Sequence, residues 1–147
     1  MSTVKVKKLR ENAVIPSRAT SGSAGMDLYS AEDESIVIPP HECRMIHTGL
    51  SIALESNRYA AFVYARSGIA IKHGIAPANC VGVIDSDYRG EIICGLVNQF
   101  ETPYTVEPGE RVAQLIIAPV DLPEIEITDE LDETQRGSGG FGSTGKR

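Results

Sequence analysis

Two carboxylates, a phenol and a guanidinium occur together at residues 85–90, in the order Asp-Ser-Asp-Tyr-Arg-Gly. This polar string lies between two strand-like runs, Val81–Ile84 and Glu91–Cys94, and its residue types favour a turn. The segment therefore predicts a β-hairpin with a functional tip. A hairpin that opens slightly would expose backbone donors and acceptors that can pair with a planar base. The alternative is an ordinary acidic turn, because Asp favours turns in any protein.

A glycine-rich segment, Arg136–Gly145, provides a second set of groups suited to ligand binding. Glycines let backbone N–H groups approach an anion closely, and Arg136 offers a bidentate guanidinium. Phe141 can stack on a planar base. The alternative is a flexible Gly/Ser tail. Gly140–Lys146 reads G-x-x-x-x-G-K, but a phosphate-binding P-loop is rejected because that motif requires Ser or Thr where Arg147 stands.

Three further segments carry polar side chains that suit phosphate or metal chemistry. Arg66, Ser67 and Gly68 stand at the start of a short helical pattern, where free backbone N–H groups favour phosphate, although a simple capped turn has the same composition. Asp27 lies in a polar loop, where a single Asp is usually a turn residue. Gln114 lies on an otherwise apolar strand, where a buried amide needs hydrogen-bond partners.

In order along the chain, these five segments resemble the five motifs of the trimeric dUTPase family, whose members hydrolyse dUTP to dUMP and pyrophosphate. The matching segments are Ser23–Ala31, Ala65–Ala70, Gly82–Glu91, Pro108–Ile117 and Arg136–Gly145. The resemblance covers nearly the whole chain. It implies attack of water at the α-phosphate, in a reaction that limits uracil incorporation into DNA and supplies dUMP for dTMP synthesis.

The resemblance also implies roles for residues around the polar string. Asp85 would orient and deprotonate the attacking water, a task that suits a carboxylate. Tyr88 would pack beneath the sugar and leave no room for a 2′-hydroxyl. Asn79 and the backbone at Gly82 and Ile93 would bind uracil. A cytosine amino group would meet the wrong polarity there, and a 5-methyl group would meet backbone walls.

The remaining motifs are implied to bind the phosphates and to close the site. The residues concerned are Arg66, Ser67, Gly68, Gln114, Arg136, Phe141, Gly142 and Ser143. Asp27 would hold waters of a Mg²⁺ ion that the three phosphates chelate. Mg²⁺ keeps several of its waters, so a dedicated carboxylate cluster is not required. Arg111 is expected to support the site by pairing with an acidic side chain.

The family implies a homotrimer with active sites shared between subunits. Two rival interpretations stay open: a dCTP deaminase, which shares the fold, and a nucleotide-sensing or structural trimer without turnover. The Asp-x-Asp-Tyr string and the Phe141 tail fit the hydrolase better than the deaminase, and Asp85 at the position of the base argues against a pure binder. Release of pyrophosphate or of ammonia distinguishes these activities.

The elements that must position these residues are strands. Short runs rich in Val, Ile and Tyr alternate with turn-forming residues, which predicts an all-β, jelly-roll-like sandwich or barrel. One short helix is expected, with Ser67 as its N-cap. We expect a β domain over residues 1–128 and a flexible glycine-rich C-terminal arm over 129–147 that closes the active site. The strand-like runs are Val4–Leu9, Ser35–Ile38, Arg44–Leu54, Tyr59–Val63, Cys80–Ile84, Ile92–Phe100, Tyr104–Val106 and Arg111–Pro119.

Composition narrows the classes of partner. A chain of 147 residues fits one domain, and its net charge of −6 argues against a nucleic-acid polymer as ligand. No apolar run approaches the roughly 18 residues that a membrane-spanning helix needs, so no membrane partner is expected.

The cysteines and histidines suggest neither a disulfide framework nor a metal site. The three cysteines are an odd number without C-x-x-C spacing, and Cys80 and Cys94 are expected in the core as reduced thiols. Reduced cysteines indicate a cytoplasmic and/or nuclear protein. His41, His47 and His73 are not spaced as metal ligands and are expected at the surface or at strand edges.

Overall fold

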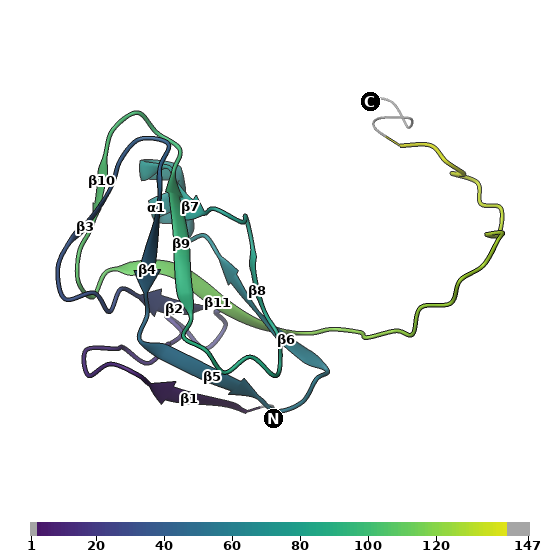
Figure 1. Ribbon diagram of the computed structural model, residues 1–147, viewed down its shortest axis with the longest axis horizontal. Coiled ribbons are helices and arrows are strands. Elements are labelled where there is room, and N and C mark those ends of the chain that lie inside the picture. Colours follow the sequence, from purple (N-terminus) through teal and green to yellow (C-terminus); the bar gives the residue numbers. More distant parts are fainter. Residues whose placement is uncertain (1–2, 141–147) are drawn as a thin grey trace.

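The computed structural model describes residues 3–140. Within that range the chain forms eleven strands and one short helix (Figure 1). In chain order they are β1 (Val4–Lys8), β2 (Met26–Tyr29), β3 (Ile36–Ile38), β4 (Cys43–His47), β5 (Leu50–Leu54), β6 (Tyr59–Tyr64), α1 (Ser67–His73), β7 (Ile75–Pro77), β8 (Gly82–Ile84), β9 (Ile93–Asn98), β10 (Tyr104–Val106) and β11 (Arg111–Pro119).

Two sheets contain most of the strands. One has the strand order β2-β11-β6-β8 and the other β4-β9-β7, while β1-β5 and β10-β3 form two-stranded ribbons. The strand pairs are antiparallel. The all-β, jelly-roll-like prediction is confirmed, and in the described range the sheets stay open rather than closing into a barrel.

The core lies between these layers and consists of side chains from alternate strand positions. Leu28 of β2, Ile46 of β4, Leu96 of β9 and Leu115 of β11 are all at most 1% exposed. Asn98 is also fully buried, and its amide donates hydrogen bonds to the backbone oxygens of Ile38 and Thr102 at 3.0 and 2.8 Å. These bonds satisfy a polar group that would otherwise destabilise the core.

The predicted hairpin around residues 85–90 is wrong. β8 pairs with β6, whereas β9 pairs with β4 and β7, so the two strands that flank the polar string belong to different sheets. Residues 85–92 therefore form a connection between sheets rather than a hairpin turn, and we call it the 85–92 loop. Strand pairing depends on partners distant in sequence, which a local turn signal does not reveal.

Several other local expectations also need correction. The run 44–54 is two strands, separated at Gly49 with a φ of 66°, which favours glycine. Asp27 lies on a strand rather than in a loop. Arg66, not Ser67, is the N-cap of α1, and its side chain makes no capping hydrogen bond. Cys94 is buried as expected, but Cys80 is exposed in a turn with a φ of 64°.

After Pro119 the chain leaves the body (Figure 1). Between Val120 and residue 140 it forms no strand or helix, and its apolar side chains are exposed, at 87% for Ile125, 93% for Ile127 and 85% for Leu131. The division into a 1–128 domain and a 129–147 arm stays a prediction. Among the residues that the structure describes, no helix is long and apolar enough to cross a membrane.

Candidate active site

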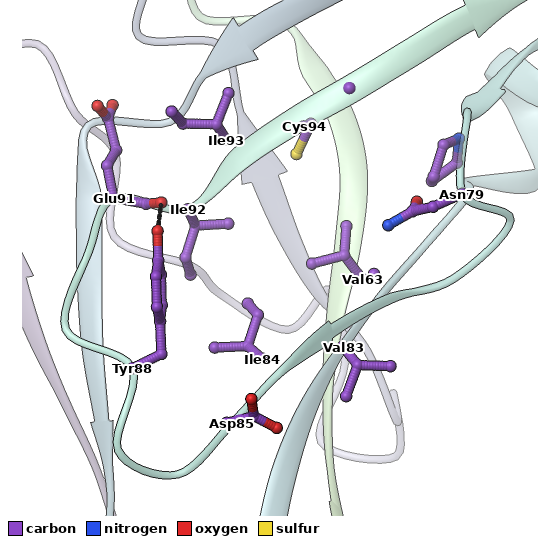
Figure 2. Close-up of a pocket in the computed structure, with 13 residues that line it drawn as sticks. Val63, Asn79, Val83, Ile84, Asp85, Tyr88, Glu91, Ile92, Ile93 and Cys94 are labelled. Carbon is purple, nitrogen blue, oxygen red and sulfur yellow. Dashed lines mark hydrogen bonds between the residues drawn. The ribbon is translucent and has the colours of Figure 1, made fainter.

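A pocket of about 220 Å³ opens where β8 and β9 diverge into their separate sheets (Figure 2). It brings together Asn79, Gly82 and Ile93, predicted to bind the base, Tyr88, predicted to pack beneath the sugar, and Asp85, the predicted general base. Its lining is Val63, Pro77, Asn79, Gly82, Val83, Ile84, Asp85, Tyr88, Glu91, Ile92, Ile93, Cys94 and Gly95.

The pocket is flanked by strand edges that lack strand partners. β8 is the last strand of its sheet, so among residues 3–140 only its inner edge is paired, with β6. β9 pairs with β7 through residues 96–98 only, which leaves Ile93 and Cys94 without a strand on that side in the described chain. Unpaired backbone N–H and C=O groups are strong donors and acceptors. They can form hydrogen bonds with the edge of a planar heterocycle, as one nucleobase does with another.

Two small features shape the base end of the pocket. At Gly82 a Cβ atom would lie 3.2 Å from the Val63 Cβ, so glycine allows β8 to lie close against β6. Asn79 stands in a tight turn in which the Val81 N–H donates to the Asn79 carbonyl at 2.7 Å and the Cys80 N–H donates to the Pro77 carbonyl at 2.9 Å. The turn presents the Asn79 amide to the pocket, on the side opposite Tyr88 (Figure 2).

Asp85 and Tyr88 occupy the loop end of the pocket. The exposed Asp85 carboxylate contacts no cation or hydrogen-bond donor in the part of the chain that the structure describes, so its oxygens remain available to a water. The Tyr88 N–H donates to the Asp85 carbonyl at 3.2 Å, and the Tyr88 hydroxyl donates to the Glu91 carbonyl at 3.0 Å. These bonds fix the phenol ring across the pocket from Asn79 (Figure 2).

A second polar cluster forms where β2, β11 and the start of α1 meet. Gln114 on β11 lies opposite Asp27 on β2. Asp27 accepts a hydrogen bond from the Arg66 Nε at 2.7 Å through one oxygen and from Arg111 at 3.3 Å through the other. Arg111 therefore pairs with an acidic side chain, as predicted.

The Gln114 amide is held in place from two sides. It donates to the Ala65 carbonyl at 2.9 Å, and a Cβ at Gly25 would lie 2.4 Å from its Oε1. The same cluster thus fixes the backbone that leads into Arg66, Ser67 and Gly68. A Cβ at Gly68 would meet nothing within 4 Å, so the start of α1 is open to a ligand.

Within one chain, the Asp27 cluster is separate from the pocket between β8 and β9. No residue of the Asp27 cluster or of α1 lines the pocket between β8 and β9. Arg136 lies on the arm, where its Nε donates only locally, to the Gly139 carbonyl at 3.0 Å. Phe141, Gly142 and Ser143 lie outside the described residues. The predicted site residues in the described range thus form three separate groups: those of the pocket, those in or beside the Asp27 cluster, and Arg136 on the arm.

Comparison with known proteins decides the family. Residues 11–145 match the dUTPase family model. The chain belongs to the dUTPase family. It is 48% identical to the deoxyuridine 5′-triphosphate nucleotidohydrolase of Desulfitobacterium hafniense strain DCB-2 and 45% identical to that of Polynucleobacter asymbioticus, with 99% of both chains covered in each case.

Solved dUTPase structures share the fold over most of the chain. The dUTPase of Staphylococcus bacteriophage 80alpha with dUPNHPP superimposes with a TM-score of 0.90 at 30% identity, covering 97% of this chain and 98% of the phage chain. A mutant dUTPase of phage phi11 of S. aureus, in which a structural Mg(II) ion is coordinated, gives a TM-score of 0.80 at 25% identity over 89% of this chain.

In this dUTPase-family chain, Asp27 is the acidic side chain whose surroundings suit contact with a hydrated metal ion. Within the described range no group of three His, Cys, Asp or Glu side chains converges. Asp27 uses each carboxylate oxygen once, toward Arg66 and Arg111. A carboxylate has about four lone-pair sites, so Asp27 can still accept hydrogen bonds from metal-bound water.

Sequence reasoning missed part of the pocket wall. Val63 reaches the pocket from β6, and no local signal marks it because its position depends on the β6-β8 pairing. Glu91 and Gly90 lie in the quoted motif, but the motif alone gave them no role. The structure shows that Gly90 lies against the Tyr88 ring and that Glu91 accepts the Tyr88 hydrogen bond.

Proposed function

We propose that this protein is a dUTP diphosphatase, which hydrolyses dUTP to dUMP and pyrophosphate by attack of water at the α-phosphate. The observation that carries the proposal is the pocket between β8 and β9, where the Asp85 carboxylate, which has no hydrogen-bond or ion-pair partner among residues 3–140, stands near the Tyr88 ring. Family membership and relatives named as deoxyuridine 5′-triphosphate nucleotidohydrolases support it. The reaction would limit uracil incorporation into DNA and supply dUMP for dTMP synthesis.

Asp85 is the proposed general base. Its carboxylate orients a water and accepts a proton as the water oxygen attacks phosphorus, and pyrophosphate leaves. In phosphoryl transfer the protein contributes mainly positioning and charge stabilisation. A carboxylate that is not already paired with a cation suits the task, because its lone pairs are free to aim the water.

Base and sugar selectivity are assigned to the same pocket. The backbone edges at Gly82 and Ile93 and the Asn79 amide bind uracil, and their polarity opposes the cytosine amino group. The backbone wall leaves little space for a 5-methyl group. The Tyr88 ring packs beneath the sugar, where a 2′-hydroxyl would collide with it.

Phosphate binding is assigned to Arg66, Ser67, Gly68, Gln114 and Arg136. The first four lie in or beside the Asp27 cluster, where Arg66 offers a guanidinium and the start of α1 offers backbone N–H groups. Mg²⁺, when bound, would neutralise charge on the phosphates. Asp27 would hold its waters, and the dUTPase of phage phi11, which coordinates a structural Mg(II) ion, supports only that a relative can bind this metal.

A homotrimer with shared active sites would unite the separate groups. In a single chain the pocket and the Asp27 cluster are separate, and the arm leaves the body after Pro119. Contributions from neighbouring subunits would place the cluster and arm of other copies over the pocket. Phe141, Gly142 and Ser143 of the arm would then cover the base and phosphates and exclude water.

Incubation with dUTP, dCTP, dTTP and UTP in the presence of Mg²⁺ tests the function. We expect pyrophosphate from dUTP and little from the other three. Ammonia release from dCTP would instead support a deaminase, and nucleotide binding without either product would support a sensing or structural trimer. Omission of Mg²⁺ from a parallel dUTP reaction tests the metal requirement.

A further inference from the structure

The Tyr88 ring is confined by the two residues that follow Arg89. Its hydroxyl donates to the Glu91 carbonyl at 3.0 Å (Figure 2). A Cβ atom at Gly90 would lie 2.3 Å from the Tyr88 hydroxyl oxygen and 2.5 Å from its Cζ. Gly90 does not adopt a left-handed conformation, so the restriction at this position is space rather than backbone strain.

The Glu91 carbonyl is itself held in place by the Glu91 side chain. The carboxylate is directed away from the pocket (Figure 2), and its Oε1 accepts the Gly49 N–H at 2.8 Å and lies 3.6 Å from the Arg10 Nε. Gly49 cannot shift easily, because a Cβ there would lie 2.8 Å from the Ala13 Cβ. Glu91 thus ties the end of the 85–92 loop to the packed turn between β4 and β5.

Neighbouring bonds hold the rest of this end of the loop. The Ser51 hydroxyl donates to the Arg89 carbonyl at 2.7 Å, and the Thr48 hydroxyl donates to the Ile92 carbonyl at 2.6 Å. The Ile92 N–H donates to the Leu50 carbonyl at 2.7 Å. The Glu91 carbonyl, which accepts the Tyr88 hydrogen bond, is therefore part of a fixed segment. Of the hydrogen bonds that hold this segment, the one to the Gly49 N–H is made by the side chain of Glu91, the same residue whose carbonyl accepts from Tyr88.

We propose that Gly90 and Glu91 are positioning residues that set the selectivity of the pocket for deoxyribose by holding the Tyr88 ring. The inference rests on the proposed function and deepens it. A ring can exclude a single hydroxyl only if it cannot move by about the size of that group. Gly90 provides the space for the ring, and Glu91 provides a stationary acceptor for its hydroxyl.

The test compares kcat/KM for dUTP with kcat/KM for UTP in each variant. Gly90→Ala should lower the dUTP/UTP ratio by about tenfold or more, because the added methyl displaces the ring. Glu91→Ala should lower it about three- to tenfold, the usual effect of losing one hydrogen bond. Glu91→Gln keeps an acceptor for the Gly49 N–H and should retain most of the wild-type ratio. Gly22→Ala is the matched glycine control, since a Cβ there meets nothing within 4 Å.

The ratio separates positioning from loss of folded protein, because a smaller folded fraction lowers both rates equally. A second comparison tests the route through Tyr88. Tyr88→Phe removes the hydroxyl that Glu91 accepts, so adding Glu91→Ala to Tyr88→Phe should change the ratio little further.

An unchanged ratio in Gly90→Ala and in Glu91→Ala would overturn the inference, and so would fully additive losses in the Tyr88→Phe background. If Glu91→Ala does not fold, Gly90→Ala decides the matter. Failure of the wild-type protein to release pyrophosphate from dUTP is a different result, because it overturns the proposed function itself.

Discussion

A chain shortened to end at Thr134 removes Arg136 and the glycine-rich segment and leaves the body of the protein intact. Residues 121–138 are exposed, and the hydrogen bonds of Arg136 and Gly137 are local. Surface changes of this kind alter the free energy of unfolding by about 0.5 kcal/mol or less. We therefore expect the truncated chain to fold and to assemble normally but to lose most of its turnover.

Mixing two inactive forms tests whether the pocket and the arm of one active site come from different subunits. The first form carries Asp85→Asn and an intact arm, and the second is the Thr134 truncation with an intact Asp85. They are unfolded and refolded together in equal amounts. If assembly into symmetric trimers is random, a site gains an intact pocket with probability of about one half and an intact arm with the same probability. About one quarter of the sites would then be complete.

A control mixture tests the same arrangement of subunits, but here shared sites predict less activity than sites within one chain. Wild-type chains are refolded with chains that carry both the Asp85→Asn change and the truncation. Sites shared between subunits again predict about one quarter of wild-type activity, whereas sites within one chain predict about one half. For the two inactive forms, sites within one chain predict no activity. Activity that fails to return, in trimers shown by mass spectrometry to be mixed, would refute the shared-site proposal.

Two substitutions and one labelling experiment test individual residues. Asp85→Asn should lower kcat by about 10²–10⁴-fold with an unchanged melting temperature, and an unimpaired kcat would show that another group activates the water. Burial acts to raise the pKa of Glu32, but hydrogen bonds from the His47 backbone and imidazole and the charges of His47 and Arg10 outweigh it, so the pKa is lowered from 4.5. This group stabilises the fold above its unfolded pKa and stops doing so as pH falls through the folded value. Glu32→Ala should therefore cost about 1–3 kcal/mol at neutral pH and less below 4.5, as measured by urea unfolding; an equal cost at both would contradict this. Burial raises the pKa of Cys94 to about 12, so its thiol should resist alkylation at neutral pH while Cys43 and Cys80 react; rapid labelling of Cys94 in the folded protein would show that its burial is incomplete.

Most of the strands could be predicted from the sequence because their signal is local. Short, nearly continuous apolar runs mark β6 and β11, and turn residues mark the ends. β2 could not be predicted in the same way, because Met26–Tyr29 is short and carries Asp27 in its middle. It becomes a strand through pairing with β11, a partner more than eighty positions later in the chain.

For the site, too, local sequence patterns revealed some features, and contacts distant in sequence determined the others. The pocket residues Asn79, Gly82, Asp85, Tyr88 and Ile93 were predicted from the family resemblance, and the structure brings them together. The cause of the pocket was predicted wrongly, because a hairpin was expected. The roles of Gly90 and Glu91 depend on contacts to Tyr88 and Gly49, and the Gly49 contact crosses more than forty positions. Such contacts leave no periodicity in the sequence.

The pairing of β8 and β9 into different sheets supports the proposal that a base binds in this pocket. In a hairpin, β8 and β9 would use their facing N–H and C=O groups on each other. Because β8 pairs with β6 and β9 with β4 and β7, the facing edges have no strand partner among residues 3–140, and the side chains around them line a pocket. An open edge invites pairing with other chains, and edges are commonly protected by being short. β8 has only three residues, Gly82–Ile84, which is too short an edge for extended pairing yet long enough to contact the single base that we propose it binds.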